Sequence, residues 1–163
     1  MAVPGEALAP AAGLNGFLLA GGLLSAAASL LHLACILVGP SMYLALGAGR
    51  RMAEMAAAGH WYPTVMTLGI AGVLAAWAYF ALAGAGLLPR PPLLKAGLVA
   101  VTAVYLLRGS AVLPILLAPR AADGSVQVAG AGGPLSFWIW SSAICLAIGA
   151  VHLAGLVRGW RGL

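Results

Sequence analysis

The sequence predicts an all-α polytopic membrane protein, an antiparallel bundle of four transmembrane helices with a short amphipathic helix between the first two spans. The 163 residues are 63% hydrophobic and only 7% charged, whereas a soluble domain carries about 25% charged residues. Four apolar segments exceed the ~20 residues that cross a bilayer as a helix. No segment alternates like the strands of a membrane β-barrel, so helices are the expected spanning elements.

The spans belong to a single integral membrane domain that covers residues 1–163, and Pro- and Gly-rich segments separate them. The predicted spans are about 14–39, 64–88, 93–118 and 135–157. The turn at Pro89–Pro92 is short enough to predict an antiparallel hairpin between the second and third spans. The Gly-rich stretch 119–134 is typical of an exposed loop.

The N-terminus lacks the features of a cleavable signal peptide, because no basic residue precedes Arg50 and the first apolar run is long. We therefore expect the first span to be retained. Cations near span ends predict the orientation. One side holds Arg90, Lys95, Arg158 and Arg161, and the other holds Arg50, Arg51 and Arg120. The excess on the first side favours cytoplasmic locations for both termini.

The connection between the first two spans is rich in helix-forming residues from Arg50 to Ala58 and is ended by Gly59. It predicts a short amphipathic helix at the outer end of the bundle. Small and polar residues three or four positions apart predict the packing faces of three spans. These faces are Gly22, Ser25, Ser29, His32 and Cys35; Gly69, Gly72, Ala76, Tyr79 and Ala83; and Ser142, Cys145, Gly149 and His152.

Arg108 is the most informative residue, because a charge at the bilayer centre costs ~2.5–3.5 kcal/mol on insertion scales. An inward, paired arginine is the favoured interpretation, and snorkelling to the interface is the alternative. Of the three acids, Glu6 belongs to the opposite side and Asp123 to the predicted loop. Glu54 is therefore the predicted partner, although it can also pair with Arg50 four residues earlier on its own helix.

Most of the reactive or hydrogen-bonding side chains fall in the outer half of the predicted bundle, which suggests a polar, positively charged cavity open to the outside. The candidate ligand-binding residues are Arg108, Glu54, His32, Tyr105, Tyr62, Ser142, Arg50 and His60. Such a site fits a small anionic or amphipathic ligand, such as a lipid head group or a quinone-like molecule. Membrane lipids are expected neighbours in any case.

Polar residues also hold membrane helices together, so a structural or accessory subunit of a larger membrane complex is the alternative. Its partner would be another membrane protein or a second copy of the chain. An intramembrane enzyme or a transporter is less favoured. His32, Cys35 and Cys145 lack a fourth metal ligand, and no motif orients Ser141 or Ser142 as a nucleophile. No catalytic residue, metal site or cofactor is predicted, and eight scattered cations do not form a nucleic-acid-binding patch.

Four stretches carry a resemblance to other proteins. They are Gly47 to Glu54, His60 to Thr64, Thr67 to Ala71, and Tyr105 to Gly109. The chain resembles a group of small bacterial inner-membrane proteins to which no activity is assigned. The resemblance implies a four-helix integral membrane protein and transfers no catalytic role. Together with the Ala-, Gly- and Leu-rich composition, it implies a multi-pass protein of the bacterial inner (cytoplasmic) membrane.

Overall fold

A computed structural model describes residues 13–117 and 135–163, and these residues form helices and turns without a strand. Each helix begins or ends where the sequence supplies a proline, a glycine or a capping side chain. The helices are α1 (Gly16–Val38), α2 (Pro40–Ala45), α3 (Arg50–Ala57), α4 (Trp61–Gly84), α5 (Leu94–Ser110), α6 (Val112–Leu117) and α7 (Leu135–Gly159). The predicted loop at 119–134 lies outside the described residues.

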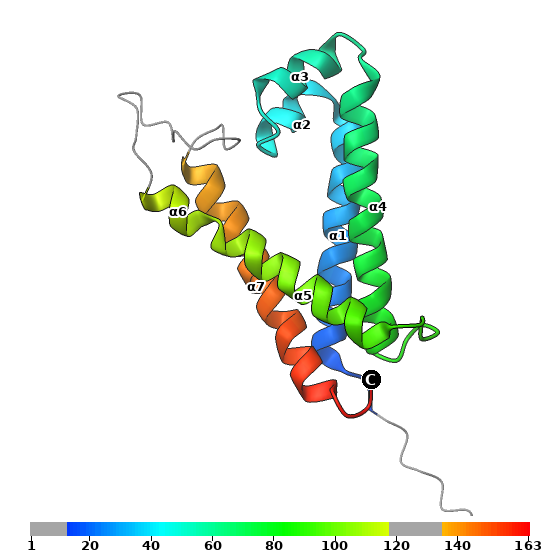
Figure 1. Ribbon diagram of the computed structural model, residues 1–163. Helices are drawn as coiled ribbons and strands as arrows, with labels where there is room; N and C mark the ends of the chain where they lie inside the picture. The colour runs from blue at the N-terminus through cyan, green and yellow to red at the C-terminus, as the bar shows by residue number, and fades with distance from the viewer. Residues whose placement is uncertain (1–12, 118–134) are drawn as a thin grey trace, which may run out of the picture.

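Four helices are long and apolar enough to cross a membrane, which confirms the predicted class. The candidate spans are Gly16–Val38, Trp61–Gly84, Leu94–Pro114 and Leu135–Gly159. Successive spans run in opposite directions, so the described ends of the chain lie together at one end of the molecule (Figure 1). We call this end the base, and we call the opposite end, where α2 and α3 lie, the cap end.

Two short helices, rather than one, connect the first two spans. Gly47 and Gly49 separate α2 from α3 with φ angles of +72° and +88°, a left-handed backbone that favours glycine. The turn also needs glycine for space, because a Cβ on Gly47 would overlap the ring of Phe137 in the first turn of α7. The segment that contains α2 and α3 thus contacts both α1 and the start of α7.

The four spans are arranged as two pairs that diverge from the base toward the cap end (Figure 1). In one pair α1 runs beside α4, and in the other α5 runs beside α7. Although 85–93 is the short connection between α4 and α5, these two helices meet mainly near that turn (Figure 1). The predicted antiparallel hairpin between the second and third spans is present, but α5 packs more extensively on α7 than on α4.

The pairs meet through an apolar cluster at the base and a second one near mid-span. At the base, Leu18 packs with residues of the other three spans, including Ala81, Leu98 and Leu156. Near mid-span, the second cluster consists of Leu74, Val101, Tyr105 and Ile148. A third cluster at the cap end contains Cys35, Tyr43 and Ala53, and it joins α1 only to α2 and α3.

Two of the three predicted packing faces are confirmed. Ser25 and Ser29 of α1 are buried, as are Ser142 and His152 of α7. The α4 face was predicted wrongly at its first four positions, because Gly69, Gly72, Ala76 and Tyr79 are all exposed and only Ala83 is buried. No atom of another element lies within 4 Å of a Cβ built on Gly69 or Gly72. The face of α4 that packs inward contains Thr67, Ala71, Leu74, Ala78 and Ala81.

Candidate functional site

Arg108 lies near the end of α5, and its guanidinium group faces α7. It donates a hydrogen bond to Ser141 Oγ at 3.1 Å and a longer one to Ser142 Oγ at 3.4 Å. The guanidinium carbon also lies 5.0 Å from the ring centroid of Trp138, in the geometry of a cation–π contact. We call Arg108, Trp138, Ser141 and Ser142 the Arg108 cluster.

Close contact between α5 and α7 positions this cluster. A Cβ on Gly109 would lie 2.5 Å from Leu146 Cγ, and one on Gly149 would lie 2.8 Å from Leu106 Cδ2. The two glycines therefore allow the helices to approach more closely than larger residues would, as is common between membrane helices. This approach brings the Arg108 side chain to the hydroxyl groups of α7.

The predicted ion pair between Arg108 and Glu54 is wrong. Within residues 13–117 and 135–163, both hydrogen-bond acceptors of the guanidinium group are serine hydroxyls. Glu54 is exposed on α3, because the opposite side of that helix, with Ala53, Met52 and Ala56, packs in the apolar cluster at the cap end. The pairing of α5 with α7 therefore gives Arg108 neutral partners in place of a carboxylate.

The Arg108 cluster has more donors than its described neighbours satisfy. An arginine carries five N–H donors, and Ser141 Oγ itself donates to Trp138 O at 3.4 Å. The indole Nε1 of Trp138 is buried and has no hydrogen-bond partner in the described part of the chain. The cluster is thus cationic and suited to a group that supplies acceptor oxygens.

Tyr105 lies on α5 but points away from the Arg108 cluster, into the centre of the bundle. Its hydroxyl group shares a 3.0 Å hydrogen bond with Ser25 Oγ on α1. Its ring makes an edge contact with Trp77 and lies 5.4 Å from the ring of His152 on α7. Among the described residues, Ser142 is therefore the only other predicted site residue that is hydrogen-bonded to Arg108.

The remaining predicted residues lie on α1 or at the cap end. His32 is half-buried, with Nδ1 2.8 Å from Ala28 O of its own helix. His60 caps α4 by accepting a hydrogen bond from Tyr62 N at 3.2 Å. Tyr62 and Arg50 are exposed. No hydrogen bond between described residues connects any of these four to Arg108.

His152 was predicted on the packing face of the last span but not among the candidate site residues. It is fully buried, and its Nδ1 lies 2.9 Å from Ile148 O. Its Nε2 is buried and has no partner among the described atoms. The ring faces Gly21, where a Cβ would lie only 2.7 Å from His152 Cε1. A buried histidine opposite a glycine thus lies at the junction of the two helix pairs.

No family model, curated protein or solved structure matches the chain in the comparisons made. The resemblance to small bacterial inner-membrane proteins consequently stays a prediction. The four apolar helices indicate a membrane-embedded protein. No cluster of three or more His, Cys, Asp or Glu side chains that could hold a metal ion occurs in the described residues.

Proposed function

We propose that this protein binds, through the Arg108 cluster, an amphipathic ligand whose polar end is anionic or rich in acceptor oxygens. The single observation that carries the proposal is a half-buried arginine in a membrane span whose described partners are neutral hydroxyls. Charges within spans are costly and usually have partners or functions. A phosphate or carbonyl oxygen would complete the coordination that the serines begin.

The chemistry of the cluster favours an acceptor over a donor. The guanidinium group, with five N–H donors, and Trp138 Nε1, which has no partner among the described residues, are donors only. In surroundings of low dielectric constant, an anion near the guanidinium group gains more electrostatic energy than it would in water. A lipid phosphate and a quinone carbonyl both supply such oxygens, and both are attached to an apolar body.

The surroundings of the cluster allow such a ligand to arrive from the bilayer. Leu107 is 70% exposed beside Arg108, and Trp140 is 70% exposed beside Ser141. In a membrane these side chains face lipid, so an amphipathic molecule reaches the guanidinium group without crossing a packed core. Within this proposal, Arg108 supplies charge, and Ser141 and Ser142 hold the guanidinium group in place.

We place the protein in the bacterial inner membrane with both termini in the cytoplasm. Four cations, Arg90, Lys95, Arg158 and Arg161, lie at the base, on the connection or helix ends near it. The positive-inside rule assigns that end to the cytoplasm. The Arg108 cluster then belongs to the outer half of the membrane.

Quenching of tryptophan fluorescence by brominated lipids in nanodiscs tests the proposed binding. Brominated phosphatidylglycerol should quench the Trp138 emission, obtained by subtracting the Trp138→Phe spectrum, more strongly than brominated phosphatidylcholine. A short-chain quinone, itself a quencher, provides the second arm of the experiment. Arg108→Leu should remove whichever preference is found, and Arg108→Lys should retain part of it because the charge remains.

Arg161→Leu is the matched control, because it removes one cation at the opposite end of the molecule. It should leave the Trp138 signal unchanged. Equal quenching by both lipids together with no saturable quenching by the quinone would contradict the proposal. A preference that survives in Arg108→Leu would also contradict it.

A second candidate function, membership of a larger assembly, is favoured by the exposed glycine face of α4. Gly69 lies in a shallow apolar groove of about 490 Å³ together with Met66, Val73 and Trp77. Small residues of this kind commonly allow close approach between membrane helices. If a second copy covers this face, native mass spectrometry from nanodiscs should show a dimer that Gly69→Leu converts to a monomer. A monomeric wild-type protein would exclude the homo-oligomeric form of this candidate.

A further inference from the structure

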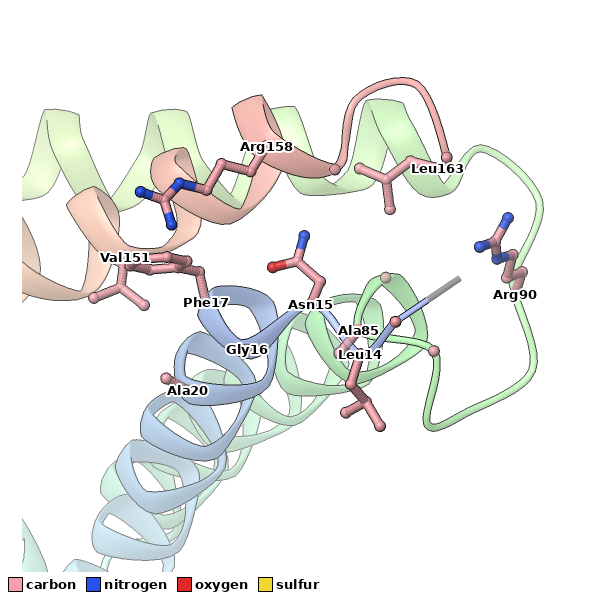
Figure 2. Close-up of a pocket in the computed structure, with 15 residues that line it drawn as sticks. Leu14, Asn15, Gly16, Phe17, Ala20, Ala85, Arg90, Val151, Arg158 and Leu163 are labelled. Atoms are coloured by element: carbon pink, nitrogen blue, oxygen red, sulfur yellow. The ribbon is translucent and has the colours of Figure 1, made fainter. Parts of the chain in front are cut away.

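A cavity of about 720 Å³ opens at the base, and no residue of the Arg108 cluster lines it (Figure 2). We call it the basal cavity. The beginning of α1, the turn after α4 and the end of α7 all contribute to its wall. Arg158 and Arg90 lie on opposite sides of it in Figure 2, with Asn15 and Leu163 between them.

The wall of the basal cavity is held in place by the side chain and backbone of Asn15. Its Nδ2 donates to Gly155 O of α7 at 2.8 Å, and its Oδ1 accepts from Leu18 N at 3.2 Å. Its backbone N–H donates to Ala85 O at 3.3 Å. Asn15 thus ties α1 to α7 and to the end of α4, so the hollow is bounded by connected elements.

The charged side chains that line the basal cavity are both arginines. The guanidinium carbon of Arg158 lies 4.5 Å from the ring centroid of Phe17, so the arginine is supported on an aromatic face. Arg90 comes from the exposed connection between α4 and α5. No acidic residue within 13–117 or 135–163 lines the cavity, since the acid in that part of the chain is Glu54 at the cap end.

The start of α1 adds to this positive character. Gly16 and Phe17, the first two helical residues, both line the basal cavity. The first N–H groups of a helix have no partner within the helix, and the Asn15 side chain takes only that of Leu18. The helix N-terminus carries a partial positive charge that favours an anion.

The other side of the wall is apolar, which distinguishes this cavity from a binding site for a free ion. Phe17, Ala20 and Val151 face it from α1 and α7. These residues belong to membrane-spanning helices, so the apolar side continues into the lipid-facing surface. A cationic rim above an apolar wall at the end of a span matches an anionic phospholipid at a membrane interface.

We infer that the basal cavity is a binding site for an anionic phospholipid, with its polar head group at the rim that Arg158 and Arg90 flank and an acyl chain along Phe17 and Val151. This site is separate from the Arg108 cluster and does not depend on the ligand proposed there. Its ligand would reside in the leaflet at the base. The site would anchor this end of the bundle to anionic lipid.

Native mass spectrometry of the full-length protein in neutral detergent tests this inference. Dioleoyl phosphatidylglycerol, dioleoyl phosphatidylcholine and inorganic phosphate are titrated separately. The wild-type protein should prefer phosphatidylglycerol, and Arg158→Gln or Arg90→Gln should weaken that binding about fivefold to tenfold, as expected for loss of one partly exposed charge-assisted contact. Arg158→Lys should lie between wild type and Arg158→Gln.

Two control variants separate this site from general surface charge and from the Arg108 cluster. Arg161→Gln removes a cation from the same end that does not line the basal cavity, so it should leave the affinity unchanged. The effects of Arg158→Gln and Arg90→Gln should persist when combined with Arg108→Gln. If the Arg108 cluster binds no ligand, Arg158→Gln and Arg90→Gln should therefore still weaken phosphatidylglycerol binding.

Three results would overturn the inference. One is equal affinity for phosphatidylglycerol and phosphatidylcholine in the wild-type protein. Another is an equal loss of binding in Arg161→Gln and Arg158→Gln, which would indicate non-specific attraction to the basic end. The third is competition by millimolar inorganic phosphate as effective as by the lipid, which would make the cavity a site for a soluble anion.

Discussion

Replacing Gly21 by alanine tests the contact at which the two helix pairs meet. The new methyl carbon would lie 2.7 Å from Cε1 and 2.8 Å from Nδ1 of His152, well inside the ~3.5–4.0 Å at which heavy atoms pack. The ring cannot easily turn away, because its Nδ1 lies 2.9 Å from Ile148 O and its centroid lies 5.4 Å from that of Tyr105. The substitution must therefore shift α1 relative to α7 or displace the ring.

The expected loss in the free energy of unfolding is measured against the same substitution at a glycine that has free space. Overpacking of this kind typically costs about 1–3 kcal/mol. Gly69→Ala is the matched control, since no atom of another element lies within 4 Å of its Cβ position, and it should gain up to about 1 kcal/mol from helix propensity. The free energies of unfolding of the two alanine variants should therefore differ by about 1–3 kcal/mol, with Gly21→Ala the less stable.

SDS titration in detergent micelles, followed by far-UV circular dichroism, measures these free energies of unfolding. In a His152→Ala background the clash is removed, so Gly21→Ala should then behave like Gly69→Ala. Two results would refute the reasoning: a Gly21→Ala variant within about 0.5 kcal/mol of the control, or a cost that persists in the His152→Ala background. Either result would mean that Gly21 and His152 are not in contact.

Further predictions concern the hydrogen bonds and charges of the spans. Arg108→Leu and Glu54→Gln should show a coupling energy below about 0.5 kcal/mol in a thermal-unfolding cycle, because the two side chains are not paired; a larger value would restore the ion pair. Tyr105→Phe should lower the free energy of unfolding by about 1 kcal/mol through loss of the bond to Ser25. A cycle with Ser25→Ala measures that bond, and additive effects would show that it is absent. Asn15→Ala should cost about 1–3 kcal/mol, since it removes a helix cap and leaves a carbonyl without its donor. SDS titration checks this, and a loss under about 0.5 kcal/mol would contradict the role of Asn15 at the base.

The amino-acid sequence by itself determined the class of the protein and the approximate position of each span. Its first predicted span, 14–39, compares with Gly16–Val38 in the structure, and its last, 135–157, with Leu135–Gly159. This agreement has a simple cause: backbone polar groups in lipid must be satisfied within the segment, so a long apolar run is necessarily helical. Composition and length are enough to locate such a run.

Only part of the candidate site could be predicted in the same way. A charge within an apolar run drew attention to Arg108, and the small polar stripe on the last span correctly included Ser142 as inward-facing. The partner was predicted wrongly, because Glu54 was the nearest suitable acid along the predicted topology. The sequence around Arg108 and Glu54 does not indicate that α5 packs against α7. That packing brings the serine hydroxyls to the guanidinium group of Arg108.

The tertiary structure alone decided which face of α4 is buried and where the helix pairs meet. α4 buries Ala71 and Ala78 and leaves Gly69 exposed, although glycine and alanine are both small enough for close packing. In a soluble helix the polar side would have marked the exposed face, but lipid and protein interior are both apolar, so hydropathy does not distinguish them. The choice instead depends on specific contacts between distant residues, such as Ser29 Oγ donating to Ala71 O at 2.8 Å.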